Sequence, residues 1–195
     1  MSQEKVEERK FVRYNLASGG IKMDGYIGVD IKKTDEVDVV MDLEKFPWPI
    51  ESNSVDEIFC SHYIEHTPDM IKFMDECYRI LKPAEFDPNL PNKAISGFMT
   101  AITPYYSSMR AWQDPTHLRA ISEASYLYYN KDWRVMNKLD HYGIKSNFNY
   151  TYGYSMDPFW AAKNAEMQAY AIKHYMNVVN DIQVVLTKIE EAITK

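Results

Sequence analysis

Cysteine is scarce in this sequence, which contains only Cys60 and Cys77 among 195 residues. Two cysteines are too few for a disulfide framework and are typical of a protein from a reducing compartment. No stretch is apolar over enough residues to cross a membrane, and the charged first ten residues lack the apolar core of a secretory signal. We therefore expect a cytoplasmic protein with no membrane partner.

An excess of positive charge is also lacking. The chain carries 22 basic and 28 acidic residues, for a formal net charge of −6. Nucleic acid is therefore not indicated as the main partner, because affinity for a phosphate backbone depends on Lys and Arg. Hydrophobic residues make up 46% and charged residues 26% of the chain. This balance predicts one globular domain over residues 1–195, with residues 1–10 as a flexible lead-in.

Internal repeats and low-complexity tracts are absent, whereas aromatic residues are abundant. The chain contains 15 Tyr, 8 Phe and 4 Trp, and the tyrosines are concentrated after residue 100. This distribution is typical of an amphipathic cleft lining or of a self-association surface, and equally of a Tyr-rich core edge. A homo-oligomer is therefore among the expectations.

Extended and helical patterns alternate along the first half of the chain. Strands are expected at 11–16, 26–31, 37–41, 55–60 and 94–103. A helical period of apolar residues begins near Pro68 and ends at Lys82-Pro83, and residues 84–94 are expected to be a proline-containing loop. The alternation predicts an α/β fold with a mainly parallel sheet.

The second half is less regular. Ser122 is a suitable cap for a helix over 123–132, and residues 143–154 have the composition of a strand. The segment 157–195 is expected to begin with a helix that extends to about Met176. Residues 178–189 fit either a further helix or a final strand, because their apolar spacing suits the first and their β-branched residues suit the second.

Small and acidic residues follow successive predicted strands. Ala17-Ser18-Gly19-Gly20 follows the first strand, Asp30 ends the second and Asp42 follows the third. In a parallel sheet these positions meet at one edge, where ligands bind. Small residues let the backbone approach a ligand closely. A carboxylate at the second strand end can accept hydrogen bonds from both hydroxyls of a ribose, and one at the third can accept from an adenine amino group. The pattern therefore favours a nucleoside-containing ligand.

Six motifs in order resemble those of class I S-adenosylmethionine-dependent methyltransferases, in particular small bacterial and phage members. They are Asn15-Leu16-Ala17-Ser18-Gly19, Gly25-Tyr26-Ile27-Gly28-Val29-Asp30, Asp42-Leu43-Glu44-Lys45-Phe46-Pro47-Trp48, Ser54-Val55-Asp56-Glu57-Ile58, Ser61-His62-Tyr63-Ile64-Glu65-His66 and Tyr78-Arg79-Ile80-Leu81-Lys82-Pro83. Asp114-Pro115-Thr116-His117 is similar to a downstream element of some members. The resemblance implies a Rossmann-like sheet of seven strands and S-adenosylmethionine as cofactor.

The resemblance also implies roles for individual residues. Ala17, Ser18 and Gly19 would hold the methionine part of the cofactor, and Asp30 would hold the ribose. Asp42 and the Leu43 backbone would face the adenine, and Ser61 and His62 would lie near the methionine end. The short separation of Gly19 from Asp30 implies that the first crossover helix is shortened or missing.

Two places depart from the family pattern. The family usually has Gly where Ala17 stands, and two glycines where Ala84-Glu85 follows Lys82-Pro83.

The acceptor side is expected between Thr103 and Arg119. His117 is the candidate acid or base, because His titrates near neutrality. Asp114 would orient it, and Arg119 would bind an anionic group. Tyr105, Tyr106 and Trp112 would line the acceptor pocket. The alternative is a structural loop held by Asp-Pro turn chemistry, with the aromatic residues packed against the C-terminal helix.

His62-Tyr63-Ile64-Glu65-His66 also matches the H-x-x-E-H pattern of inverted zinc proteases. That site needs both histidines on one helical face, whereas here they lie between a strand and a helix start. We therefore expect no metal, and Glu65 and His66 would instead cap the next helix or brace the loop.

Three functions remain open from the sequence. The first is methyl transfer to a small or polymeric acceptor, the second is a non-catalytic binding or structural module with the same fold, and the third is a zinc hydrolase. The absence of an Asn-Pro-Pro-Tyr-like motif argues against DNA base methylation.

Overall fold

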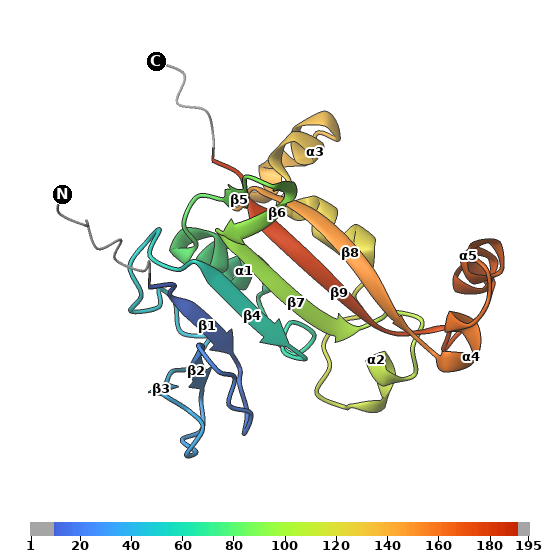
Figure 1. The fold of residues 1–195 in the computed structure, drawn as a ribbon, viewed down its shortest axis with the longest axis horizontal. Coiled ribbons are helices and arrows are strands. Elements are labelled where there is room, and N and C mark those ends of the chain that lie inside the picture. The colour runs from blue at the N-terminus through green and yellow to red at the C-terminus, as the bar shows by residue number, and fades with distance from the viewer. Residues whose placement is uncertain (1–9, 191–195) are drawn as a thin grey trace, which may run out of the picture.

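The computed structural model describes residues 10–190, so the expected lead-in over 1–10 lies outside the described residues except for Lys10. Seven strands form one sheet in the order β3-β2-β1-β4-β7-β9-β8 (Figure 1). The first five strands of this order are parallel, and β9 is antiparallel to both of its neighbours. The strand bounds are β1 Arg13–Leu16, β2 Ile27–Asp30, β3 Val39–Val40, β4 Glu57–Ser61, β7 Phe98–Pro104, β8 Phe148–Met156 and β9 Val179–Lys188. The predicted mainly parallel α/β sheet is confirmed.

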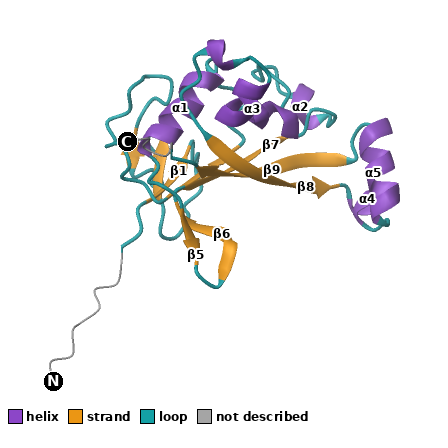
Figure 2. Cartoon of the chain, turned by 90° about the horizontal axis from the view of Figure 1, so that it is seen from above, coloured by secondary structure: helices purple, strands orange, loops and turns teal. Residues whose placement is uncertain are grey.

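Short helices cover one side of this sheet. Figure 2 shows α1, α2 and α3 on one side, the β5–β6 hairpin on the other, and α4 and α5 beyond the ends of β8 and β9. No helix of the described residues is long and apolar enough to cross a membrane. The helix bounds are α1 Met70–Ile80, α2 Arg110–Gln113, α3 Lys131–Met136, α4 Pro158–Ala161 and α5 Ala165–His174, with 3-10 helices at η1 Glu123–Tyr129 and η2 Asp140–Tyr142.

Helix α1 forms the centre of the core against the parallel strands. Asp69 caps it by accepting a hydrogen bond from the Lys72 N–H at 3.0 Å. One face of the helix is fully buried and packs with the inward side chains of the sheet, including Cys60. The buried apolar residues of that face are Phe73, Met74, Cys77 and Ile80.

The expected loop over 84–94 is wrong. The segment forms the hairpin of β5 Glu85–Asp87 and β6 Leu90–Ser96. Pro88 lies in its turn, where the Asn89 N–H donates to the Asp87 carboxylate at 2.8 Å. Pro91 is tolerated because β6 is an edge strand that pairs only with β5.

The other differences concern the second half of the chain. The expected helix over 123–132 is split at Asn130 into η1 and α3, and the expected helix over 158–176 is split into α4 and α5. The ambiguous segment 178–189 is the strand β9, buried between β7 and β8. Ile182, Val184 and Leu186 on one face of β9 are fully buried, whereas Gln183 on the other face is exposed, and a strand of this kind suits β-branched residues.

The connection from β1 to β2 contains no helix, as the short spacing predicts. Residues 17–26 form turns instead, and three of them have left-handed backbone: Ala17 with φ of 54°, Gly19 with φ of 57° and Gly25 with φ of 79°. Asp38 holds this connection against β2: its carboxylate accepts from the Gly28 N–H at 2.7 Å and from Lys22 Nζ at 2.5 Å. Glycine adopts the left-handed conformation without a penalty, whereas alanine adopts it at a steric cost.

Asp56 fixes the opposite, amino-terminal edge of the sheet. Its fully buried carboxylate accepts from the Val12 N–H at 2.8 Å, from Lys82 Nζ at 2.7 Å and from Ser96 Oγ at 2.8 Å. Its carbonyl accepts from the Gly97 N–H at 2.6 Å. Asp56 therefore joins the starts of β1, β4 and β7.

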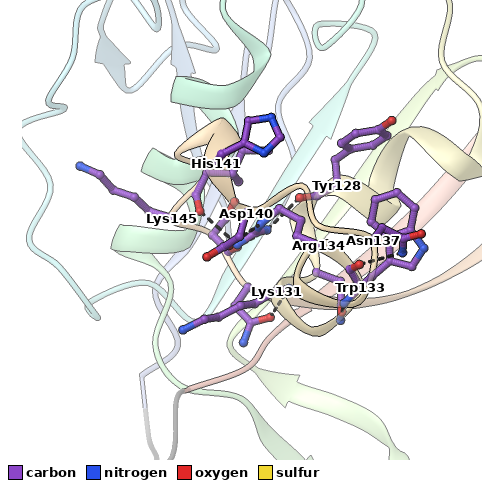
Figure 3. Close-up of polar contacts among 12 residues, drawn as sticks. Tyr128, Lys131, Trp133, Arg134, Asn137, Asp140, His141 and Lys145 are labelled. Carbon is purple, nitrogen blue, oxygen red and sulfur yellow. Dashed lines mark hydrogen bonds and ion pairs between the residues drawn. The ribbon is translucent and has the colours of Figure 1, made fainter.

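A second buried charge stabilises the helical segment between β7 and β8 (Figure 3). Arg134 is 1% exposed, and its guanidinium donates to the carbonyls of Tyr128, Ile144 and Ser146. Its Nε is 3.4 Å from the Asp140 carboxylate. These contacts fold η1, α3 and η2 into one unit.

Replacing Ala17 by glycine should stabilise the protein. The left-handed conformation costs a non-glycine residue about 1–2 kcal/mol, and the greater entropy of unfolded glycine offsets about 0.5–1 kcal/mol of that gain. Ala17→Gly should therefore raise the free energy of unfolding, measured in urea, by roughly 0.5–1 kcal/mol. Ala162→Gly is the matched control, because Ala162 has φ of −78° and glycine there should lower stability. A less stable Ala17→Gly variant would contradict the expectation.

Removing the Asp56 carboxylate should destabilise the fold by about 3 kcal/mol, because three donors lose their acceptor. Burial alone would raise the pKa of Asp56, but the bonds from Lys82, Val12 and Ser96 outweigh burial and lower it. Because the folded-state pKa lies below the unfolded-state value of about 3.9, this stabilisation is complete above that pH and is lost as pH falls through the folded-state pKa.

Urea unfolding of Asp56→Ala at pH 7 and at pH 3 tests both parts of this expectation. The difference from the parent protein should be large at pH 7 and smaller at pH 3. Exposed Asp35→Ala serves as the control. An equal difference at both pH values would refute the assignment of the stabilisation to the ionised carboxylate.

Candidate active site

The carboxyl ends of β1, β2 and β3 meet the segment that follows β4, and they enclose a cavity of about 280 Å³. This is the point where the strand order changes direction, because β1 lies between β2 and β4. The lining is mostly apolar with a few polar groups. It consists of Ala17, Asp30, Ile31, Met41, Asp42, Leu43, Glu44, Tyr63, His66 and Pro68.

Asp30 stands at the end of β2 and faces this cavity. Its Oδ2 accepts from the Gly19 N–H at 2.9 Å, and its Oδ1 accepts from the Lys32 N–H at 3.0 Å. A carboxylate has about four lone-pair sites, so about two remain for a ligand. The same contacts hold the turn after β1 against the end of β2.

Asp42 and Leu43 form the opposite side of the cavity. The Asp42 Oδ1 accepts from the Glu44 N–H at 3.0 Å, and Oδ2 is 3.5 Å from Lys45 Nζ. Leu43 is 5% exposed, and its carbonyl accepts from the Trp48 indole at 3.1 Å. The cavity wall continues through Tyr63, whose hydroxyl donates to Glu44 at 2.5 Å.

Three other residues expected near a cofactor, Ser18, Ser61 and His62, do not line this cavity. The Ser18 hydroxyl is enclosed, and only the Gly19 part of its turn is exposed. Ser61 is the last residue of β4, and His62 follows it with left-handed backbone, φ of 54°. Ser61 and His62 lie beyond the residues that line the cavity.

Next to the cavity lies a cluster of Glu65, His66 and His117, whose ligand atoms are all within 4.8 Å of one another. Glu65 is 1% exposed, and neither of its carboxylate oxygens has a hydrogen-bond partner among the described residues. Its Oε1 forms an ion-pair contact with His62 Nδ1 at 3.4 Å and lies 4.0 Å from His117 Nε2. The Glu65 carboxylate raises the pKa of His62.

The two histidines of the cluster are held by their other ring nitrogens. His117 Nδ1 is 3.0 Å from the Ala111 carbonyl, which can only accept, so Nδ1 carries the proton. His66 Nδ1 is 3.0 Å from Thr116 Oγ1, which already donates its proton to Asp114 at 2.7 Å. His66 Nδ1 therefore also donates. Each neutral ring then has an unprotonated Nε2, and the rings meet edge to face at 4.6 Å.

The segments that carry this cluster are bonded to each other. The Leu118 N–H donates to the Glu65 carbonyl at 2.8 Å. The Arg119 guanidinium donates to the carbonyls of Ile64, Thr67 and Pro68. Arg119 was expected to bind an anionic group, but its guanidinium is occupied in bracing the 64–68 segment.

The remaining residues of the expected acceptor side fall into two groups. Tyr105 is 1% exposed, and its hydroxyl donates to Glu123 at 3.0 Å, so it belongs to the core rather than to a pocket wall. Tyr106 and Trp112 are exposed and linked, because the Trp112 indole donates to the Tyr106 carbonyl at 3.0 Å. Asp114 contacts Thr116 and thereby orients His66 instead of His117.

A larger hollow, of about 520 Å³, lies along β8 and β9. Tyr152, Tyr154 and Gln183 are among its lining residues, and it contains none of the strand-end carboxylates Asp30 and Asp42. We therefore assign the chemistry to the smaller cavity, where polar groups converge at the strand ends.

Residues 22–85, about a third of the chain, match the family model described as a methyltransferase domain. No curated protein matches the sequence of the chain.

Among solved structures, a SAM-dependent methyltransferase from Archaeoglobus fulgidus has a TM-score of 0.59 at 14% identity, and the match covers 91% of this chain and 86% of that protein. A SAM-dependent methyltransferase from Thermotoga maritima gives 0.52 at 14% identity over 94% and 84% of the two chains. The YcgJ protein from Bacillus subtilis gives 0.51 at 16% identity over 95% of each chain. Residues 22–85 therefore match a methyltransferase domain, and the seven-stranded fold of the chain is similar to that of solved SAM-dependent methyltransferases.

Proposed function

We propose that the protein binds S-adenosylmethionine in the cavity lined by Asp30, Asp42 and Leu43, and transfers its methyl group to an acceptor that enters beside His66 and His117. The match of residues 22–85 to a methyltransferase domain and the similar fold of SAM-dependent methyltransferases support the general part, methyl transfer with S-adenosylmethionine as the donor. The observation that carries the specific part is the convergence of Asp30 and Asp42 on one cavity at the change in strand order.

The residues of the cavity suit an adenosine group. Asp30 retains acceptor capacity for the ribose hydroxyls after its bonds to Gly19 and Lys32. Asp42 offers an acceptor for the adenine amino group on the opposite wall. Ile31, Met41 and Leu43 supply apolar contact for the base between these carboxylates. The Ala17–Gly19 turn, whose backbone approaches the cavity, would hold the methionine part.

The cofactor supplies an activated methyl group on a sulfonium, so the protein needs to contribute mainly position. The Ala17–Gly19 turn and Asp30 fix one end of the site, and their mutual hydrogen bond holds them in place before the cofactor binds. Tyr63 and Pro68 wall the cavity on the side of β4, where they exclude water.

The acceptor side of the proposal comprises the 105–119 segment. Tyr106 and Trp112 offer exposed aromatic surface for an acceptor, and His66 lines both the cavity and the adjacent cluster. His117 donates from Nδ1 to the Ala111 carbonyl, so in its neutral form Nε2 is the atom that can accept a proton. We propose that His117 serves the acceptor in this way, with the small-molecule or polymeric nature of that acceptor left to experiment.

Asp30→Ala should weaken binding of S-adenosylmethionine and S-adenosylhomocysteine by about 2–3 kcal/mol, because charge-assisted hydrogen bonds to the ribose are lost. Isothermal titration of both ligands measures the change. Asp35→Ala is the matched control, since Asp35 is an exposed carboxylate in the turn that follows β2. Unchanged affinity in a folded Asp30→Ala protein would eliminate the ribose assignment.

His117→Ala should lower turnover by about a hundredfold or more while cofactor affinity changes little, because the residue acts on the acceptor. Release of S-adenosylhomocysteine across a panel of acceptors measures turnover, and it also separates an enzyme from a non-catalytic binding module. Exposed His141→Ala is the control. If His117→Ala lowers the melting temperature and cofactor affinity together, the residue has a structural role only.

A further inference from the structure

We infer that Glu65, His66 and His117 form a binding site for a divalent transition-metal ion beside the cofactor cavity. The three residues come from two segments far apart in the chain, and their ligand atoms lie within 4.8 Å of one another. Two imidazoles and one carboxylate are a ligand set that binds zinc or iron(II) and leaves coordination positions open. Zn²⁺ binding is measured without turnover, so its failure would leave the proposed methyl transfer untouched.

The strongest support is the state of Glu65. Its carboxylate is buried, and neither oxygen has a hydrogen-bond partner among residues 10–190. An ionised carboxylate in such a position is costly unless a positive charge compensates it. His62 Nδ1 forms an ion-pair contact with Oε1 at 3.4 Å, but this contact leaves Oε2 without a partner among the described residues. A cation between Glu65, His66 and His117 would compensate the charge directly.

The histidines are oriented as metal ligands require. Both rings have the proton on Nδ1, as shown by the Ala111 carbonyl for His117 and by the Thr116–Asp114 pair for His66. Both Nε2 lone pairs are therefore available. Metal-bound histidines usually donate their other N–H to a carbonyl or carboxylate in this way, which fixes the ring and strengthens the ligand. The chain Asp114–Thr116–His66 is such an arrangement.

The distances require only a small contraction. Metal bonds of about 2.0–2.2 Å place tetrahedral ligand atoms roughly 3.3 Å apart. His117 Nε2 and Glu65 Oε1 are 4.0 Å apart, so the side chains need to close by about 1 Å or less each. The bonds of Leu118 and Arg119 to the 64–68 segment hold the two backbones in register for this contraction.

The ligand set also explains why the H-x-x-E-H pattern is misleading here. That pattern would use His62 and His66, which do not share a helix. The structure instead offers His117 in place of His62 and makes Glu65 a ligand. In the metal-bound protein the Nε2 of His117 would be occupied, so His117 would not also accept a proton from the acceptor.

The test is isothermal titration of Zn²⁺ into chelator-treated protein that carries no affinity tag, with Mg²⁺ as the hard-cation comparison. One Zn²⁺ per chain is expected, with much weaker Mg²⁺ binding because the site has two nitrogen ligands. Glu65→Gln, His66→Ala and His117→Ala should each weaken Zn²⁺ binding by about a hundredfold, and Thr116→Val by about tenfold. His62→Ala and His141→Ala should change it by less than about threefold.

Two results would overturn the proposal. The first is the absence of Zn²⁺ binding that depends on Glu65 and His117. The second is binding that His62→Ala abolishes and His117→Ala leaves intact. The melting temperatures of the variants, measured in chelator, show whether a loss of Zn²⁺ binding comes from unfolding. Glu65→Gln should then be at least as stable as the parent protein, whereas a structural ion pair between Glu65 and His62 predicts a lower melting temperature.

Discussion

The register of the parallel strands is the constraint on which the site depends. It is fixed at the amino-terminal edge, where Asp56 bonds to the start of β1, to Lys82 after α1 and to the start of β7. Because strands rise by a constant distance per residue, fixing one edge fixes the other. The carboxyl ends therefore align, and Asp30 faces the turn after β1 at hydrogen-bond distance. A slip by one residue would turn that carboxylate to the other face of the sheet.

A second set of contacts brings the acceptor side to the cofactor side. Arg119 donates to three backbone carbonyls of the segment after β4, and Leu118 bonds to the carbonyl of Glu65. These contacts hold His117 beside Glu65 and His66 without help from a ligand. Arg119 thus contributes to the site by its position, since a planar guanidinium with five donors can bind several carbonyls at once. Residues that hold the site residues in place in this way fix the geometry of a site.

The parts that could be predicted from the sequence are those whose signal is local. Each early strand is short, ends in a recognisable small or acidic residue, and lies in chain order, so Asp30 and Asp42 could be placed at one edge from topology alone. The strand β9 could not be distinguished from a helix, because the apolar Val185 on its open face interrupts the alternation of apolar and polar residues. The hairpin over 85–96 was hidden by Pro88 and Pro91, which occupy a turn and an edge strand.

The contact between Glu65 and His117 could not be predicted, because it joins residues that only the tertiary fold brings together. The same holds for Arg119, whose charge suggested a ligand although its partners are backbone carbonyls. One signal was available: Glu65 and His66 sit in a motif, and His117 follows Asp114-Pro115-Thr116 in another. Combining the two would have required knowing that β4 and β7 are neighbours, since each segment follows one of these strands.

Glu65 Oε1 pairs with His62, but its buried Oε2 has no hydrogen-bond partner among the described residues, which violates a rule that folded proteins seldom break. Such violations concentrate at functional sites, where binding or catalysis repays their cost. Here the violation lies one residue from His66, which lines the cofactor cavity and belongs to the cluster at once. A cation bound to Glu65 would therefore contact a ring that borders the proposed cofactor cavity. Because His66 belongs to both the cavity and the cluster, a ligand bound in one should change the affinity of the other.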